Sequence, residues 1–298
     1  MFRNLDTSVL GIGGPQSEVI EQSLTYGFQA MDFDVVEFAA RAKLRGMAHA
    51  RRLIDSSRVR IGTFGLPFRP EEDQATFNEN LARLEDWAAA AAEVGCGRCV
   101  TWVEPAGDRL PYHENFTFHC DRFAAICGVL RPHDARLGVG IRAAADLRRG
   151  KAFQFIHDFE ALSMLTKMVN AANIGLAIDV WDLFVSGGSL ETLRGLSADQ
   201  LVAVRLADAP PDVPLEDLTE SSRRLPSVEG RFDVPGALAA LAEMGYKGPV
   251  SVSPHRTAMG SNGGPVIKTL GQSLDAVWNA AGLNVKGRLP VTAQGAKR

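Results

Sequence analysis

Polar side chains that could carry chemistry stand at the ends of several short apolar runs. Glu104 follows one run and Asp179 ends another. Arg205 and Asp208 lie together at the end of a third. A carboxylate in such a place can act as a general base, and a guanidinium can bind an anion or polarise a carbonyl group. These four are candidate catalytic residues; alternatively, the aspartates cap helices and Glu104 is a solvated loop carboxylate.

Further side chains near the same run ends could bind a substrate. An exposed tryptophan ring can stack on a sugar ring, or it can simply pack in the core. A serine two residues before a histidine on a strand is not a nucleophilic pair, because no nucleophile elbow surrounds it. The Arg223-Arg224 pair is most simply a solvated face. The candidates for substrate binding are Trp102, His113, Asp182, Arg224, Glu229 and His255.

The secondary-structure elements that must position these residues follow a repeated sequence pattern. An amphipathic helical pattern runs into a glycine and then into a short β-rich run. The repeat occurs at residues 18–34, 81–103 and 238–252, with Gly27, Gly95 and Gly245 at the helix ends. Glycine there supplies the left-handed cap that ends a helix.

Extended over the chain, this pattern predicts strands alternating with helices such as 75–92 and 153–170. Eight alternating units fit a single-domain (β/α)₈ TIM barrel better than an open doubly wound sheet. The run from Gly11 to Pro15 is too short for a dinucleotide-binding glycine motif. The predicted strands lie near 8–12, 30–34, 60–64, 98–103, 137–142, 174–179, 201–206 and 249–253.

Composition limits the class of protein. The 298 residues are 46% hydrophobic and 22% charged, with a net charge of −3, which is typical of a folded globular chain. We expect no nucleic-acid partner because no excess of basic residues attracts phosphates. No signal peptide or membrane span is apparent, so we expect a cytoplasmic protein. The cysteines at 96 and 99 are expected to be buried fillers, with a redox pair or half a zinc site as alternatives.

Two segments stand apart from the alternating pattern. Residues 209–231 are proline-rich and are expected to form a long loop over the active face of the barrel. We take residues 1–283 as the barrel domain and 284–298 as a C-terminal tail, either a mobile end or a strap in a homo-oligomer.

The order of several phrases resembles the xylose isomerase-like TIM barrels, a superfamily of sugar isomerases, epimerases, inosose dehydratases and endonuclease IV. The resemblance covers roughly residues 7 to 281. It rests on TWVEPAGDRLPYHENFTFHCDRFAAICGVLRPHDARLGV, NIGLAIDVWDLF, VAVRLADAP and SSRRLPSVEGRFDVPGALAALAEMGYKGPVSVSP.

The resemblance implies a divalent metal site, which this sequence does not reproduce. In the family, the ligands are a Glu, an Asp, a His and a Glu from successive strands. Here the Asp matches Asp179, while the other positions fall near Gly140, on Arg205 and on Ser253. A further family His corresponds to Asp182, and the resemblance places the family's loop Arg and Glu on Arg223 or Arg224 and on Glu229. Arginine has no lone pair to give, so we expect no metal and hypothesise that Arg205 pairs with Asp179 in its place.

Two classes of function remain open on these grounds. One is a carbohydrate- or polyol-binding pseudoenzyme, or metal-independent relative, that keeps the pocket of a sugar isomerase. The other is an active isomerase, epimerase or lyase on a sugar or keto-polyol. That enzyme either works without a metal or holds Mn²⁺ or Mg²⁺ through rearranged ligands drawn from Glu104, His113, Asp179 and Asp182.

Overall fold

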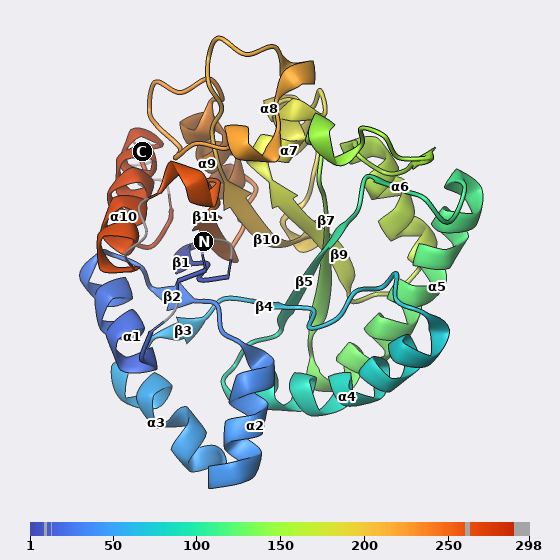
Figure 1. Cartoon of the computed structure of the whole chain (residues 1–298). Helices are drawn as coiled ribbons and strands as arrows, with labels where there is room; N and C mark the ends of the chain where they lie inside the picture. The colour runs from blue at the N-terminus through green and yellow to red at the C-terminus, as the bar shows by residue number, and fades with distance from the viewer. Residues whose placement is uncertain (9–10, 13, 260–262, 289–298) are drawn as a thin grey trace, which may run out of the picture.

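A ring of parallel strands surrounded by helices forms the body of the molecule (Figure 1). The computed structural model describes residues 1–8, 11–12, 14–259 and 263–288. In chain order, the strands of the main sheet are β1 (Phe2–Leu5), β2 (Ala30–Met31), β3 (Arg60–Ile61), β4 (Phe64–Gly65), β5 (Arg98–Val103), β7 (Arg136–Ile141), β9 (Ile174–Asp179), β10 (Leu201–Leu206) and β11 (Pro249–Val252).

The sheet closes on itself. Its nine described strands lie in the order β3-β2-β1-β11-β10-β9-β7-β5-β4. β3 pairs with β2 at one end, and β4 pairs with β5 at the other. Because Gly62 and Thr63 alone separate β3 from β4, one segment completes the ring. The nine strands therefore occupy the eight positions of a (β/α)₈ barrel, as the alternating pattern predicts.

The helices form the outer layer and cover the barrel all round in Figure 1. They are α1 (Gln16–Thr25), α2 (Val35–Arg45), α3 (Met47–Ser57), α4 (Gln74–Glu93), α5 (Tyr112–Leu130), α6 (Phe159–Val169), α7 (Val180–Val185), α8 (Leu190–Arg194), α9 (Val234–Glu243) and α10 (Gly263–Ala280). A small antiparallel ribbon of β6 (Ala106–Gly107) and β8 (Phe153–Gln154) lies beside the main sheet's loops. Short 3₁₀ helices include η4 (Leu215–Asp217) and η5 (Glu220–Ser222) in the loop after β10.

Helix α4 shows how the sequence sets these elements. The Asp73 side chain accepts hydrogen bonds from the amides of Ala75 and Thr76, which caps the first turn. Phe77 and Leu84 are buried on the face toward the sheet. Gly95 then takes a φ of +71°, which an L side chain would resist, and turns the chain into β5.

Two predicted elements are placed differently in the structure. The expected strand at 8–12 is wrong: the first strand is β1, residues 2–5, and the described residues of 8–12 lie in the loop after it. Arg3 interrupts the apolar pattern of β1 because it reaches outward to Asp275, 2.9 Å away. The predicted helix 153–170 begins only at Phe159, where Asp158 caps α6, because the preceding residues form β8.

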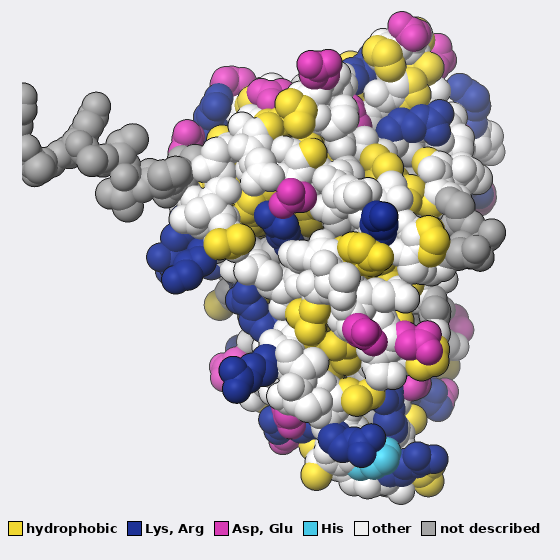
Figure 2. All heavy atoms as spheres, turned by 90° about the vertical axis from the view of Figure 1, so that its left-hand side faces the viewer, with side chains coloured by type: hydrophobic (Ala, Val, Ile, Leu, Met, Phe, Trp, Pro, Cys, Tyr) yellow, Lys and Arg dark blue, Asp and Glu magenta, His cyan; other side chains and the backbone are white. Residues whose placement is uncertain are grey.

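The surface charge, the cysteines and the C-terminal segment can be compared with the sequence-based expectations. Acidic and basic side chains are interspersed on the face shown in Figure 2. In the described part of the chain, no helix combines the length and the apolar character needed to cross a bilayer. Burial raises the pKa of the Cys96 thiol to about 12, which disfavours a thiolate. Of the tail, residues 289–298 lie outside the described residues, while Asn284 accepts a hydrogen bond from the Trp278 indole.

Candidate functional site

Two adjoining cavities lie at the carboxyl ends of the strands, where TIM barrels hold their active sites. The mouth cavity, about 360 Å³, is bordered by Arg142, Asp179, Glu220, Arg223, Ser253 and His255. The larger cavity, about 1020 Å³, is bordered by residues from the other side of the barrel, among them Thr7, Asp32, Thr63 and Thr101. Trp102, Glu104 and Arg205 border both cavities.

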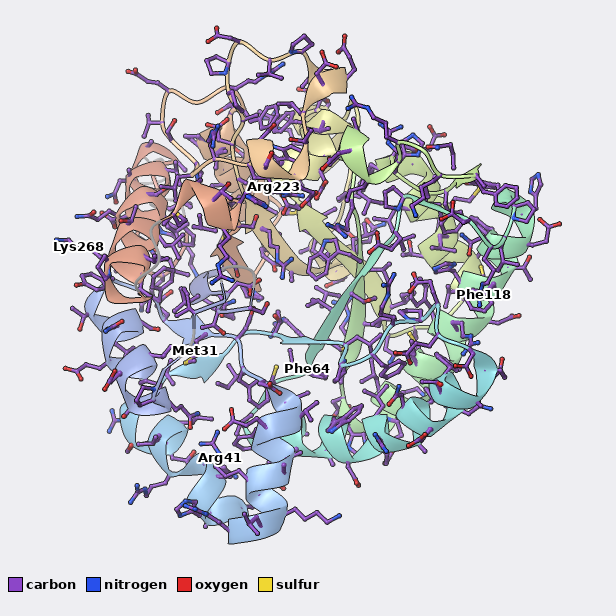
Figure 3. All side chains as sticks on the ribbon, in the orientation of Figure 1. Met31, Arg41, Phe64, Phe118, Arg223 and Lys268 are labelled. Carbon is purple, nitrogen blue, oxygen red and sulfur yellow. The ribbon has the colours of Figure 1, made fainter. Side chains whose placement is uncertain are left out.

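Arg223 forms the centre of the mouth cavity's ion pairs (Figure 3). It follows η5 in the loop after β10, and its side chain is buried. Its guanidinium donates to Asp179 Oδ2 at 2.9 Å and to Asp182 Oδ2 at 2.6 Å. A third bond, 3.2 Å long, joins Nε to Glu220. The guanidinium also lies 4.3 Å from the centre of the Trp181 ring, so its flat face is covered.

The two aspartates have their remaining oxygens occupied as well. Asp179 accepts from the Trp181 amide at 3.0 Å and from the Ser253 hydroxyl at 2.9 Å. Asp182 accepts from the Ala143 amide at 2.7 Å. Burial raises the pKa of Asp182, while the neighbouring Arg223 opposes that rise. Every oxygen of this pair thus has a donor, which makes the cluster a fixed wall of the mouth.

Arg205 does not pair with Asp179, so the hypothesis of that contact is wrong. The two residues are register partners on β10 and β9, yet the Arg205 side chain donates to Asp6 at 2.5 Å. Its guanidinium lies 3.7 Å from the centre of the Trp102 ring. Asp179 is already bonded to Arg223, so Arg205 finds its carboxylate across the barrel at the end of β1.

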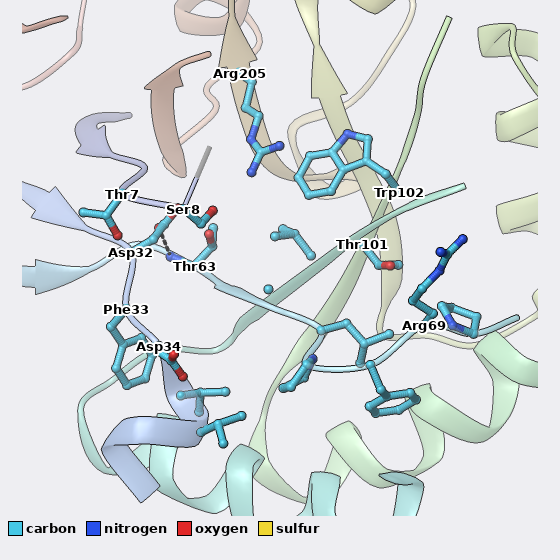
Figure 4. Close-up of a pocket in the computed structure, with 18 of the residues that line it drawn as sticks. Thr7, Ser8, Asp32, Phe33, Asp34, Thr63, Arg69, Thr101, Trp102 and Arg205 are labelled. Carbon is cyan, nitrogen blue, oxygen red and sulfur yellow. Dashed lines mark hydrogen bonds between the residues drawn. The ribbon is translucent and has the colours of Figure 1, made fainter. Parts of the chain in front are cut away.

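Asp32 borders the larger cavity beyond Arg205 (Figure 4). It accepts hydrogen bonds from Asn4 Nδ2 at 2.8 Å and from the Thr63 amide at 2.7 Å. Burial and the nearby Asp6 carboxylate raise the pKa of Asp32 to about 7, against the opposing effects of Asn4, Thr63 and Arg205. This carboxyl group therefore exchanges its proton near neutral pH.

Glu104 faces both cavities and is held by a second arginine. Arg142 Nη1 donates to Glu104 at 3.1 Å, and its Nη2 lies 3.7 Å from Glu220. Arg142 thereby links Glu104 to the Arg223 cluster. Because both side chains of the Arg142–Glu104 pair are about a third exposed, solvent screens their attraction.

The remaining predicted site residues fall into two groups. His255 borders the mouth cavity, whereas His113, Arg224 and Glu229 are exposed and border neither cavity. Asp208 is buried in the loop after β10, where it accepts from the amides of Ala209 and Phe232. Its geometry is that of a residue that shapes the loop.

Sequence reasoning missed Glu220 and Asp6, and it left open whether Arg223 or Arg224 belongs to the site. The expectation of a solvated face is wrong for Arg223, because the loop folds it back onto two buried carboxylates, while Arg224 is exposed. The sequence signal that could have indicated Arg223 was its position in the long loop predicted over the active face of the barrel. Asp6 was missed because the first strand was predicted at 8–12, whereas it is β1, which ends one residue before Asp6.

The comparisons with known proteins agree with the fold. The family model described as xylose isomerase-like TIM barrel matches residues 20–276. The chain belongs to the xylose isomerase-like TIM barrel family. No curated protein matches it.

Solved structures of the family share the fold at low identity. A xylose isomerase domain protein from Alicyclobacillus acidocaldarius is 20% identical, with a TM-score of 0.84 over 94% of this chain and 99% of that one. A zinc-bound IolI protein is 16% identical, with a TM-score of 0.77 over 94% and 99%. The 3-keto-D-glucoside 4-epimerase of E. coli is 13% identical, with a TM-score of 0.69 over 93% and 98%.

The residues at the family's metal positions do not fit a divalent ion as they stand. Mn²⁺ or Mg²⁺ needs several oxygen or imidazole ligands, whereas the positions that the resemblance implies offer the carboxylates of Asp179 and Asp182, both bonded to Arg223. At Gly140, an added Cβ would lie 2.7 Å from Trp102 Nε1 and 2.7 Å from the Ala177 carbonyl, so the tryptophan fills the space of a ligand side chain. Among the described residues, no three His, Cys, Asp or Glu side chains are grouped to hold a metal.

Proposed function

We propose that this chain binds a small carbohydrate or polyol in the mouth cavity, without a divalent ion at the position that its family uses. It would then be a carbohydrate-binding pseudoenzyme or a metal-independent relative of the sugar isomerases. The observation that carries the proposal is the buried contact of Arg223 with Asp179 and Asp182. One guanidinium there supplies the positive charge that an ion would otherwise bring.

The lining of the mouth suits a polyhydroxylated ligand. Trp102 offers an apolar edge against which the C–H groups of a sugar can pack. Glu104, Arg142 and His255 offer acceptors and donors around it. Since acids and bases are mixed in this lining, it favours a neutral ligand over a highly charged one.

Metal content and ligand binding test the proposal together. Protein purified without chelator should contain far less than one divalent ion per chain. A polyol and sugar panel should raise the melting temperature in the presence of EDTA, because binding to the folded state alone stabilises it. A tightly held stoichiometric ion, or stabilisation that requires Mn²⁺, would contradict the proposal.

An arginine exchange makes the test sharper. Arg223→Met would release Asp179 and Asp182, so Mn²⁺ should stabilise this variant while leaving the natural chain unchanged. The matched control is Arg224→Met, since Arg224 is the exposed neighbour. Equal responses to Mn²⁺ in all three proteins would count against Arg223 as the substitute for an ion.

An active enzyme is the second candidate, favoured by the state of Asp32. A carboxyl group whose pKa lies at about 7 is suited to proton transfer near neutral pH. Such an enzyme would isomerise, epimerise or dehydrate a sugar or keto-polyol. Turnover of ketoses, keto-inositols and 3-keto-glycosides, with EDTA and with Mn²⁺, decides between the candidates, because a binding protein converts none of them.

A further inference from the structure

The larger cavity holds one carboxyl oxygen that is open to a ligand. Asp32 Oδ1 accepts from Asn4 and from the Thr63 amide, which fixes the plane of the carboxyl group. Within the described part of the chain, its other oxygen, Oδ2, accepts no hydrogen bond. Asp32 is only 7% exposed, yet it borders the cavity, so this oxygen is reached from the cavity.

The charges around Asp32 favour its acid form. Asp6 accepts from Arg205, and also from the amide and hydroxyl of Ser8. Arg205 therefore compensates Asp6, and Asp32 has no ion pair of its own among the described residues. The groups that face it are the Asp6 carboxylate, the Arg205 guanidinium, the Asn4 amide, the Thr63 amide and the neutral Cys96 thiol.

The state of the proton follows from this balance. Burial and Asp6 raise the pKa of Asp32 to about 7, so near neutral pH about half of the molecules carry the proton on this group. A protonated carboxyl group donates a hydrogen bond, whereas its ionised form only accepts. In a cavity of low dielectric, such a donor holds an acceptor oxygen more strongly than it would in water.

We propose that Asp32 and Arg205 form a subsite in the larger cavity that binds an uncharged acceptor oxygen, such as the carbonyl oxygen of a polyhydroxylated ketone. The inference rests on the proposed function, because the hydroxyl groups of the same ligand would extend past Trp102 into the mouth cavity. Trp102 and Arg205 border both cavities, so a ligand that contacts them lies at the junction of the two.

The subsite selects a neutral oxygen over an anion. Arg205 is already neutralised by Asp6, so the pair of donors carries no surplus positive charge. A ligand carboxylate placed there would face Asp6 and any ionised Asp32 at short range, and like charges repel strongly when they are buried. A ketone accepts from the same donors without that cost.

Three cyclohexane polyols serve as probes: 2-keto-myo-inositol, myo-inositol and quinate. Calorimetry should show that the natural chain prefers the ketone over myo-inositol, and that this preference falls about tenfold between about pH 6 and pH 8 as the donor is lost. Asp32→Asn keeps a donor but cannot titrate, so its preference should not change with pH. The matched control is Asp86→Asn, an exposed position on α4 that borders neither cavity, and it should keep the natural profile.

Infrared difference spectra give a readout that does not depend on affinity. At pH 6 the natural chain should show the C=O stretch of one more protonated carboxyl group than Asp32→Asn, because Asp182 contributes equally to both proteins. This additional stretch should shift when 2-keto-myo-inositol is added and stay in place with myo-inositol, because only the ketone would accept its proton.

The outcomes separate this inference from the proposed function. Equal, pH-independent binding of the ketone and myo-inositol would overturn the subsite and leave carbohydrate binding intact. Tighter binding of quinate would overturn the selection of a neutral oxygen. Binding of none of the three, with no stabilisation by the wider sugar panel, would defeat the proposed function and the subsite with it.

Discussion

Arg223 reaches Asp179 across 44 positions of sequence and donates to it at 2.9 Å. The resemblance to the family implies a metal position at Asp179, and our proposal that Arg223 replaces the ion depends on this contact.

Loss of the Arg223 guanidinium should destabilise the chain. Arg223→Met leaves Asp179 and Asp182 buried without a counter-charge, and breaking a buried pair on one side costs about 3–5 kcal/mol. Urea unfolding measures this change. Arg224→Met should stay within about 0.5 kcal/mol of the natural chain because Arg224 is exposed. Adding Asp182→Asn to Arg223→Met should recover part of the loss, and a further loss instead would contradict our account.

Gly140 should tolerate no side chain. In Gly140→Ala, the new Cβ would lie 2.7 Å from Trp102 Nε1 and 2.7 Å from the Ala177 carbonyl, so we expect a loss of about 1–3 kcal/mol. Gly128→Ala is the control, since Gly128 lies in α5 with open space around it, and alanine there should stabilise the helix by about 0.5–1 kcal/mol. Equal effects of the two exchanges on thermal unfolding would refute the crowding at Gly140.

Asp32 should make stability depend on pH. Its pKa rises from 3.8 to about 7 on folding, so the folded chain holds this proton more tightly than the unfolded chain. The resulting stability is complete below about pH 4 and is lost as the pH rises through 7.

Urea titrations over this range measure the effect. The free energy of unfolding of the natural chain should fall relative to that of Asp32→Asn as the pH rises. Asp182 titrates in both proteins and cancels in the difference. A difference that stays flat with pH would show that Asp32 is ionised throughout.

Asp208 should act through the loop rather than through the ligand. Asp208→Ala would leave the buried Phe232 amide without its acceptor, at a cost of about 1–3 kcal/mol. The exposed Glu229→Ala should change stability by less than about 0.5 kcal/mol. Unfolding reports both. A variant at 208 that is fully stable yet binds no ligand would instead place Asp208 in the binding site.

The barrel could be predicted from the sequence because the residues that end its helices are recognisable locally. Gly27, Gly95 and Gly245 each take a positive φ at the end of a helix, and a glycine in such a place is readable from its neighbours. The first strand was missed because Arg3 and Asn4 break its apolar pattern, one reaching outward and the other bonding across the barrel interior.

The site was predictable only where it lies on strands. Asp179 and Arg205 were correctly expected at neighbouring strand ends, and the structure aligns them in register. Their partners were not, because Arg223 comes from a loop whose path depends on contacts far along the chain. Residue type and spacing do not reveal which of two adjacent arginines turns inward.

The junction that completes the ring is also a wall of the larger cavity. Gly62 and Thr63 separate the two short pairings of β3 and β4, and the Thr63 amide holds Asp32. A molecule bound beside Asp32 would therefore stabilise the junction between these two short pairings. Ligand binding in the cavity should therefore slow deuterium uptake at the amides of residues 60–65 more than elsewhere in the sheet, because it would suppress local opening of β3 and β4.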